Sequence, residues 1–373
     1  IEGSSIYGAG NAITTDDGAD SLYVSGVVSS STIQGNGGSD TLLFDDALNQ
    51  SVVKTGADAD WVSAQGQVSS AAVYGNKGAD TFQISGVTTE STLYGGSDST
   101  TTDGSDLISL IGSLTASTVY GNAGNDTLNF ESAVKRSAIF AGSDKDFVSV
   151  SGDLTTSEVA GNKGGDTLVF TTINKSSVYG AGNAITTDDG ADSLNFISGS
   201  SATIQGNGGA DTLSFDNHLT AAVIKGGADD DSITAAAGAV TGSSSIYGNK
   251  GDDSIALVQF LTSTLLGGTG IYYQLSGAID LTEALNNFQF DVATLTVAQA
   301  LPGGTLMALA ILLASGLGRN PEELPSALAG SRVSAIAFSR ARRSSSSVVE
   351  LVIRLSTLAS SVEQVGEVLL DRI

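Results

Sequence analysis

A glycine- and aspartate-rich turn that recurs along the chain constrains its fold more than any other feature. Each turn ends in an aspartate, and most successive aspartates lie 20 residues apart, with a step of 26 residues after the fourth and after the eighth. These aspartates are Asp20, Asp40, Asp60, Asp80, Asp106, Asp126, Asp146, Asp166, Asp192, Asp211, Asp231 and Asp253. A unit this short cannot bury an apolar face by itself, so such repeats must stack on their neighbours.

A second, longer period of 86 residues contains the short one. The sequence Tyr7–Leu22 recurs letter for letter at Tyr179–Leu194, which is two long periods further along the chain. The first turn of each long period is also longer than the turns that follow it. We therefore divide residues 1–262 into three blocks of about 86 residues, each with four repeats.

Within a repeat, apolar and polar residues alternate in short β-rich runs. One residue separates Leu42 from Phe44, and one separates Phe82 from Ile84. A period of two buries one face of a strand, and strands of stacked repeats pair in parallel. All three prolines, whose nitrogen cannot join a strand ladder, lie after residue 300. The sequence predicts a mainly β fold, a parallel β-solenoid (β-roll or β-helix) of about twelve 20-residue coils.

The turn sequences resemble a known calcium-binding motif. GNGGSDTLL (Gly35–Leu43), GNAGNDTLN (Gly121–Asn129) and GNGGADTLS (Gly206–Ser214) are similar to the nonapeptide G-G-x-G-x-D-x-U-x of hemolysin-type, or repeat-in-toxin (RTX), proteins. In that family, backbone carbonyls and the motif aspartate of neighbouring coils bind Ca²⁺. Glycines there supply the positive φ angles that direct carbonyls at the ion. The resemblance implies Ca²⁺ as the cofactor of this chain.

Three kinds of turn supply the candidate calcium ligands. The aspartates that match the motif are Asp40, Asp80, Asp126, Asp166, Asp211 and Asp253. Turns of the form G-[AS]-D-x-D match less well and offer two carboxylates each, Asp58 with Asp60, Asp144 with Asp146, and Asp229 with Asp231. The long turns end in Asp20, Asp106 and Asp192.

The chain also departs from the RTX pattern. Family members carry a Gly/Asp turn on both edges of the roll, whereas here the other edge has Ser/Thr/Asn-rich connections such as Asp45–Gln50. Asparagine also replaces the second glycine of the motif in most turns. We therefore expect a degenerate variant of the repeat, with calcium along one edge of the solenoid.

Turn geometry alone is the competing explanation for these residues, because Gly, Asn and Asp are good turn formers. Electrostatics favours a cation. Two carboxylates about 4.8 Å apart in adjacent coils repel by roughly 3.5 kcal/mol at an effective dielectric of 20, and Ca²⁺ accepts six to eight oxygen ligands. Lys77, Lys163 and Lys250, in every fourth turn, either replace an ion there or are solvated turn tips.

Composition excludes several functions. The net charge of −24 excludes nucleic acid as a partner bound through its phosphates. The chain has no cysteine and one histidine, His218, which falls on the variable connecting edge. No isolated acid–base pair and no phosphate-binding loop are found. We therefore expect no catalytic residues and no enzymatic activity.

Tyrosines recur at outward-facing positions just before the turn. They are Tyr7, Tyr74, Tyr94, Tyr120, Tyr179 and Tyr247. Such a row either forms a contact surface for a neighbouring protein or a glycan, or covers the sheet by stacking on itself.

Composition changes near residue 263. All eight lysines precede residue 251, and seven of the eight arginines lie from Arg319 onward. We expect residues 263–373 to form a small α/β C-terminal cap or assembly domain. Its predicted elements are helices at Leu306–Leu317 and Ser361–Ile373, a helix start at Asn320, and strands at Arg332–Phe338 and Val348–Leu355. The apolar run of the first helix, about a dozen residues, is too short to span a membrane. Arg340, Arg342 and Arg343 either dock on an acidic neighbouring solenoid or form a solvated loop.

Three functions remain open from the sequence. The first is a non-enzymatic, extracellular, calcium-stabilised rod of a surface layer, adhesin or filament, which self-associates or binds another surface protein. The second is a virion appendage, such as a phage tail fibre or decoration protein. The third is the calcium-binding region of a secreted hydrolase. The resemblance implies secretion through a type I system, and the start at Ile1 without a methionine leads us to expect a fragment or a processed chain.

Overall fold

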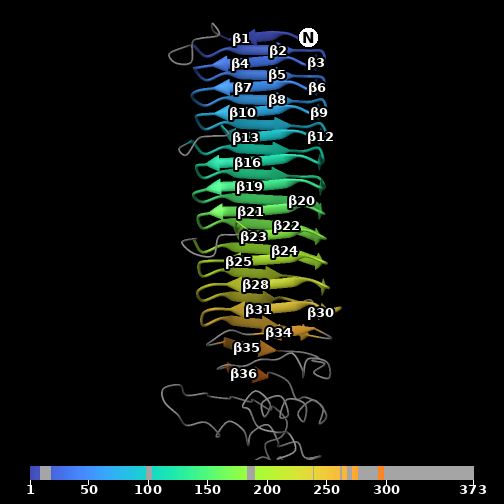
Figure 1. Cartoon of the computed structure of the whole chain (residues 1–373), viewed down its shortest axis with the longest axis vertical. Coiled ribbons are helices and arrows are strands. Elements are labelled where there is room, and N and C mark those ends of the chain that lie inside the picture. Colours follow the sequence, from blue (N-terminus) through green and yellow to red (C-terminus); the bar gives the residue numbers. More distant parts are fainter. Residues whose placement is uncertain are drawn as a thin grey trace, which may run out of the picture. The chain divides into compact units, whose positions relative to one another are not determined.

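The computed structural model describes residues 1–8, 18–97, 103–182, 190–237, 239–260, 263–266, 271–275 and 293–297. The chain divides into two compact units, Ile1–Gly208 and Gly209–Ile373. The described part of each unit is wound as a parallel β-solenoid, which confirms the predicted solenoid fold (Figure 1). The helices and strands predicted between Leu306 and Ile373, and the arginine cluster there, lie outside the described residues.

One coil of the first unit contains three strands. β4 (Thr32–Asn36) leads into the Gly/Asp turn, β5 (Thr41–Phe44) leads away from it, and the short β6 (Leu48–Asn49) precedes the corner to the next coil. Each strand pairs in parallel with its counterpart in the next coil. Ile33, for example, lies opposite Val53. The 20-residue period of the sequence is therefore the register of the sheets.

The remaining strands of the first unit repeat this pattern. Strands that lead into the turn are β1 (Ser5–Tyr7), β7 (Val52–Gly56), β10 (Ala72–Asn76), β13 (Thr92–Gly96), β16 (Thr118–Ala123), β19 (Ala138–Ser143), β21 (Glu158–Lys163), β23 (Ser177–Ala181) and β25 (Thr203–Asn207). Strands that leave the turn are β2 (Ser21–Val24), β8 (Trp61–Ala64), β11 (Thr81–Ile84), β14 (Leu107–Leu110), β17 (Thr127–Phe130), β20 (Phe147–Thr155), β22 (Thr167–Asn174) and β24 (Ser193–Ser200). Short corner strands are β3 (Val28–Ser29), β9 (Val68–Ser69), β12 (Thr88–Thr89), β15 (Leu114–Thr115) and β18 (Val134–Lys135).

The second unit has the same parallel pairing. Its strands are β26 (Thr212–Phe215), β27 (Leu219–Thr220), β28 (Val223–Gly227), β29 (Ser232–Ala235), β30 (Ala239–Thr241), β31 (Ser245–Asn249), β32 (Ser254–Leu257), β33 (Gln259–Phe260), β34 (Thr264–Leu266), β35 (Ile271–Leu275) and β36 (Ala293–Val297). β34 pairs with β31, β35 with β32, and β36 with β35. Parallel strands thus continue beyond the domain boundary expected at residue 263.

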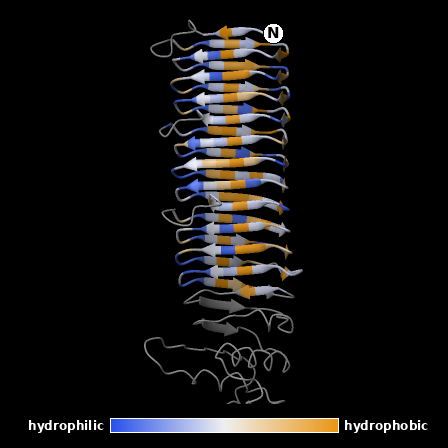
Figure 2. Cartoon of the chain, in the orientation of Figure 1, coloured by the Kyte–Doolittle hydropathy of each residue, from blue (hydrophilic) through white to orange (hydrophobic). Residues whose placement is uncertain are grey.

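The alternating apolar residues form the core of each coil. Ile33, Leu42, Phe44, Leu48 and Val53 are each at most 2% exposed. Their counterparts in later coils stack above one another, so apolar bands recur at the same place along the first unit (Figure 2). Each such side chain contributes about 1.5–3 kcal/mol by leaving water.

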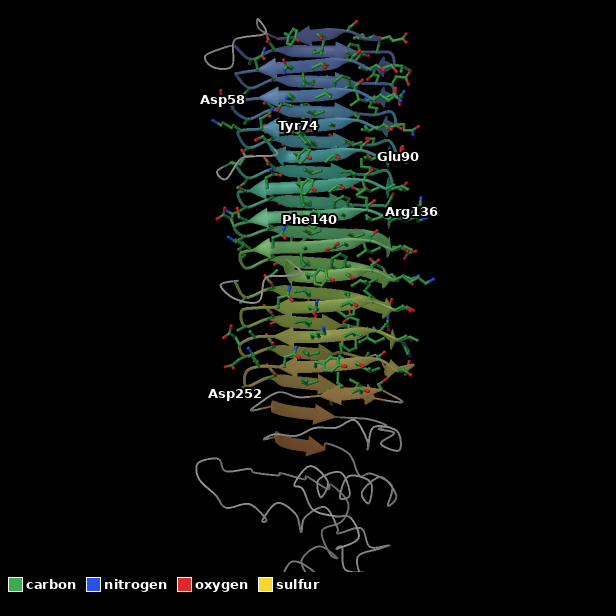
Figure 3. The ribbon with its side chains drawn as sticks, viewed as in Figure 1. Asp58, Tyr74, Glu90, Arg136, Phe140 and Asp252 are labelled. Carbon is green, nitrogen blue, oxygen red and sulfur yellow. The ribbon has the colours of Figure 1, made fainter. Side chains whose placement is uncertain are left out.

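A row of buried serines lines the corner between coils, which we call the serine edge. Its members in the first unit are Ser31, Ser51, Ser91, Ser117, Ser137, Ser157 and Ser176. The Ser51 hydroxyl accepts a hydrogen bond from the Ser31 amide at 3.1 Å and donates one to the Asn49 carbonyl at 2.7 Å. Glu90 and Arg136 mark this edge in Figure 3, and Asp58 marks the opposite one. Each hydroxyl therefore satisfies one amide and one carbonyl of the corner.

Candidate metal centre

The Gly/Asp turns form the other edge, which we call the aspartate edge, and each of the short turns contains two left-handed residues. In the turn between β4 and β5 they are Asn36 (φ 88°) and Gly38 (φ 92°). In the next turn they are Gly56 (φ 131°) and Asp58 (φ 73°). Asn and Asp tolerate this conformation better than other non-glycine residues. The asparagine that departs from the RTX motif therefore keeps the turn conformation, and so does the first Asp of G-[AS]-D-x-D.

The last aspartate of each turn points inward. In the first unit Asp40, Asp60, Asp80, Asp106, Asp126, Asp146, Asp166 and Asp192 are buried, and Asp20 is half-buried. In the second unit Asp211, Asp231 and Asp253 are buried. The predicted row of aspartates is therefore an internal feature of the turns, which we call the aspartate ladder.

In ten of the ladder aspartates, one carboxylate oxygen accepts a hydrogen bond from a backbone amide. The Asp80 amide donates to Asp106 Oδ1 at 2.8 Å, and the Asp106 amide donates to Asp126 Oδ1 at 2.8 Å. The same bond links Asp20 to Asp40 and continues to Asp192 within the first unit, and it joins Asp211, Asp231 and Asp253 in the second. These bonds fix the side-chain orientation from coil to coil.

The other carboxylate oxygen has no such role. Within the part of the chain that the structure describes, Oδ2 of Asp80, Asp106, Asp126 and Asp146 is buried without a hydrogen-bond partner. A buried polar atom with no partner loses its hydration without compensation, at a cost of about 1–3 kcal/mol or more for a charged group. Its recurrence in successive coils indicates a missing ligand.

A glycine faces three of these oxygens, those of Asp80, Asp106 and Asp126. A Cβ on Gly75 would lie 2.2 Å from Asp80 Oδ2 and 1.9 Å from the Gly95 carbonyl oxygen. A Cβ on Gly95 would lie 2.2 Å from Asp106 Oδ2 and 2.6 Å from the Gly121 carbonyl oxygen. Glycine thus allows a carboxylate oxygen of its own coil and a carbonyl oxygen of the next coil to approach its Cα more closely than a Cβ would permit.

This oxygen set fits a hard cation such as Ca²⁺. No three carboxylate or imidazole side chains converge as a metal-binding group among the described residues. A cation would therefore be held by one carboxylate from each coil together with backbone carbonyls.

Burial also makes the bare carboxylates unfavourable as anions. It raises the pKa of Asp80, Asp106, Asp126 and Asp146 to about 8, against an ordinary value of 3.8. The amide bond to Oδ1 lowers the pKa, and neighbouring carboxylates raise it further. In the second unit, burial raises the pKa of Asp231 to about 8. At neutral pH the ladder therefore requires either protons or cations.

The first aspartate of the G-[AS]-D-x-D turns lies outside the ladder. Asp58, Asp144 and Asp229 are exposed. Asp58 Oδ2 accepts a hydrogen bond from the Gly38 amide at 3.3 Å. Asp144 and Asp229 bond in the same way to the tip amides of Gly124 and Gly209. The paired carboxylates of the sequence thus separate into an inner member, in the ladder, and an outer member, which caps the preceding turn.

Asp103 was not singled out by the sequence, although it serves the same outer position. It accepts hydrogen bonds from the Gly78 amide at 3.0 Å and the Gly104 amide at 2.9 Å. Burial raises its pKa, and the nearby Lys77 lowers it. Lys77, Lys163 and Lys250 are all exposed at turn tips, outside the ladder. The signal for Asp103 was its place before a turn glycine in D-G-S-D.

Two residues of the aspartate edge were also missed. Thr55 and Ala141 occupy the inward-facing position that is glycine in neighbouring coils, as the register of β7 with β10 and of β19 with β16 shows. The signal was present in the sequence, because KTGAD and FAGSD replace the YGN or QGN of other turns.

Three tyrosines of the row, Tyr74, Tyr94 and Tyr120, stack with one another and with Phe140 in the first unit. Ring centroids of Tyr74 and Tyr94 are 4.7 Å apart, those of Tyr94 and Tyr120 4.9 Å, and those of Tyr120 and Phe140 5.3 Å. The Lys54 ammonium lies 5.5 Å from the Tyr74 ring centroid. Tyr74 and Phe140 lie on the broad face between the two edges (Figure 3). Because the ring faces cover one another, mainly ring edges are available to a partner, and a glycan or protein contact stays a prediction.

Other features bear on catalysis and on membranes. His218 is exposed beside β27, at the connecting edge. Within the described residues, no helix is long and apolar enough to cross a membrane.

Comparison with known proteins supports the fold. No protein-family profile and no curated protein sequence matches the chain. Among solved structures, it is similar to a hyperactive, Ca²⁺-dependent, β-helical antifreeze protein from an Antarctic bacterium, with 20% identity and a TM-score of 0.51. The match covers 69% of this chain and 84% of that protein. At this identity the similarity establishes a shared β-helical fold.

Proposed function

We propose that the chain is a non-enzymatic structural protein whose solenoid is stabilised by a row of calcium ions, as a one-edged variant of RTX repeats. The observation that carries the proposal is the pairing, in successive coils, of a buried Asp Oδ2 without a partner and a glycine carbonyl of the next coil. The Ca²⁺ dependence of the β-helical antifreeze protein supports the same cofactor here.

The ladder residues would bind the ions as follows. Oδ1 of Asp106 and of Asp126 stays on the amide of the preceding coil, which orients the carboxylate. Oδ2 and the glycine carbonyl of the next coil supply the two inward-facing ligands. Bound calcium supplies positive charge that offsets repulsion between carboxylates of adjacent coils. The proposed ligands are therefore the inner aspartates, and the exposed Asp58, Asp144 and Asp229 keep a capping role.

A location outside the cell is part of the proposal. Calcium sites of extracellular modules have dissociation constants of about 10⁻⁴–10⁻³ M, which only a calcium-rich compartment fills. Folding would then be coupled to export, since the apo chain carries an unneutralised charge of −24. Within this proposal the solenoid is a rod of a surface layer, adhesin or filament, and self-association or binding to another surface protein is its expected interaction.

Calcium-dependent folding is the test. Circular dichroism and thermal unfolding are measured at neutral pH in three buffers of matched ionic strength. One contains a chelator, one about 5 mM CaCl₂ and one about 5 mM MgCl₂. We expect β structure and a high Tm in calcium, and loss of both in chelator. Magnesium should not substitute, because it requires near-ideal octahedral geometry. Identical unfolding curves in chelator and calcium would contradict the proposal and leave the solenoid intact.

A further inference from the structure

The strands that leave the aspartate edge present an outward face without charged residues, which we call the neutral face. In the first unit its strands are β2, β5, β8, β11, β14, β17, β20, β22 and β24. The first and third residues of each strand point outward, because the second and fourth, such as Val62 and Ala64 of β8, point into the core. None of these outward residues is Asp, Glu, Lys or Arg, although the chain has a net charge of −24. The sheet that enters the turns, by contrast, carries Lys54 and Glu158 on its outward side.

Large apolar side chains are exposed on the neutral face. Trp61 is 43% exposed, and Leu107 and Phe147 are 38% exposed each. In the register of the sheet, Thr81 lies between Trp61 and Leu107, and Thr127 lies between Leu107 and Phe147. A large apolar residue therefore alternates with a threonine along the first position of the strands, with a repeat of about 9.6 Å. Apolar side chains gathered on one face of a soluble protein indicate an interaction surface.

The third residue of each strand varies in the opposite sense. In the strands that begin with a large apolar residue, it is Ser63, Ser109 or Ser149. In the strands that begin with threonine, it is a larger residue, namely Leu43, Gln83, Asn129 or Val169. The two outward positions thus form a checkerboard of large and small side chains.

This checkerboard is complementary to itself. A twofold axis parallel to the direction in which the coils stack would lay the first residue of a strand over the third residue of the same strand in a second copy. Leu107 of one copy would then lie over Ser109 of the other, and Gln83 over Thr81. In each such pair a large side chain meets a small one, as close packing requires.

Charge and area also favour a second copy as the occupant. Two chains with a net charge of −24 each repel one another where their acidic groups meet, and the neutral face lets them approach without this repulsion. Its nine strands, about 4.8 Å apart and four residues of about 3.3 Å long, cover about 570 Å² per copy. Two copies would bury roughly 1,100 Å² in total, which is enough for a weak specific interface.

We propose that two copies of the chain pair face to face through the neutral face and run in the same direction, with the large side chains of each copy over the small ones of the other. The inference deepens the proposed function, because it names the surface through which the rod self-associates. It requires no calcium ion at the interface.

Sedimentation equilibrium of the full-length chain in calcium tests the proposal, over about 1–100 μM, the range of weak dimers. The wild type should approach twice the 37.4 kDa of one chain. Ser109→Lys and Asn129→Lys should be monomers, because each would bury an ammonium of both copies without a counter-ion. Thr118→Lys is the matched control, since Thr118 is half-buried like Ser109 and points outward from the other sheet, and it should remain a dimer.

A mixture of two variants tests the pairing of the residues. Leu107→Glu alone should be a monomer, for the same reason as Ser109→Lys. Mixed in equal amounts, the two variants should form a dimer, because the new ammonium lies over the new carboxylate while the other half of the interface keeps its natural residues. A mixture that stays monomeric would overturn the proposed pairing.

The remaining outcomes separate this proposal from the proposed function. A monomeric wild type overturns the neutral face as a self-association surface, and so does a dimer that persists in both lysine variants or is lost equally in Thr118→Lys. Circular dichroism reports whether each variant folds, and Asn129→Lys decides if Ser109→Lys does not fold. A dimer whose fold is the same in chelator and in calcium contradicts only the calcium proposal. A monomer that folds only in calcium contradicts only this one.

Discussion

The serine edge and the aspartate edge of the first unit both turn the chain from one strand to the next, but they do so with different polar side chains. Both edges reverse the chain between strands. At both, a polar side chain inside the corner accepts a hydrogen bond from a backbone amide of the preceding coil. At the serine edge, the Ser51 hydroxyl also has a carbonyl to which it donates. At the aspartate edge, Asp80 has a second oxygen and nothing in the described chain that donates to it. The polar side chains of the serine edge find all their hydrogen-bond partners within the protein, whereas the aspartate edge requires protons or cations from solution.

The largest expected effect is on the pH dependence of the calcium-free chain. The ladder carboxyls have an ordinary pKa of 3.8, and burial raises several to about 8 in the folded state. The folded state therefore binds these protons more tightly than the unfolded state. The stability from this source is fully present below about pH 4 and is lost as the pH rises through about 8.

Thermal unfolding between pH 4 and pH 9, with and without calcium, checks this prediction. In chelator the Tm should fall steadily as the pH rises. In saturating calcium the trend should reverse, because ions and protons compete for the same oxygens. A Tm that rises with pH in chelator would show that the ladder is not the dominant buried charge.

A smaller effect is expected from Asp126→Asn, with Asp144→Asn as the matched control. The asparagine keeps an oxygen for the Asp106 amide but loses the charge. In chelator this variant should be more stable than the wild type. In calcium at 100 times its Kd it should be less stable by about 2.7 kcal/mol, the linkage energy of one lost site.

Asp144 is exposed and caps only the Gly124 amide, so its variant should change little in either condition. Denaturant unfolding of both variants in both buffers makes the comparison. Equal effects at the two positions would remove the distinction between inner and outer aspartates.

The loss of stability caused by a substitution at the serine edge should not depend on calcium. Ser137→Ala leaves the buried Ser117 amide without its acceptor and removes the donor to the Lys135 carbonyl. Leaving a buried group unsatisfied costs about 1–3 kcal/mol. Urea unfolding should show the same loss in chelator at pH 5 and in calcium at pH 7. A loss confined to calcium would mean that the two edges are not independent.

The smallest expected effect is a gain in stability. The Thr88 hydroxyl is buried with no hydrogen-bond partner in the described structure, and Val68 and Leu114 lie opposite Thr88 in the adjacent coils. Thr88→Val keeps the shape and removes the unsatisfied group. We expect stabilisation of about 1 kcal/mol, equal with and without calcium, in urea unfolding. Destabilisation would indicate that the hydroxyl has a role in packing or hydration.

Much of the solenoid follows from the sequence because its register is the sequence period. The 20-residue spacing of Asp20 to Asp80 is the pairing offset, and the alternation at Leu42 and Phe44 sets the inward face. The position of the aspartates along a single edge was also predictable, since only one connection of each coil is rich in Gly and Asp.

Finer features of the site depended on three-dimensional placement. Asp58 and Asp60 are both aspartates of the same turn, so the sequence does not distinguish them. The left-handed backbone conformation of Asp58, with φ 73°, directs its side chain outward. The deviation at Thr55 is a single letter, and its inward direction follows from the register of β7 with β10. The roles expected for residues 306–373 lie outside the described residues and stay predictions.

Anomalous diffraction from crystals grown in calcium tests the central claim most directly. The account predicts a row of calcium peaks inside the aspartate edge, each about 2.3–2.6 Å from a ladder Oδ2 and a glycine carbonyl oxygen. It predicts none at the serine edge. A map with no peaks beside Asp80, Asp106 and Asp126, or with peaks only at the exposed Asp58 and Asp144, would contradict it.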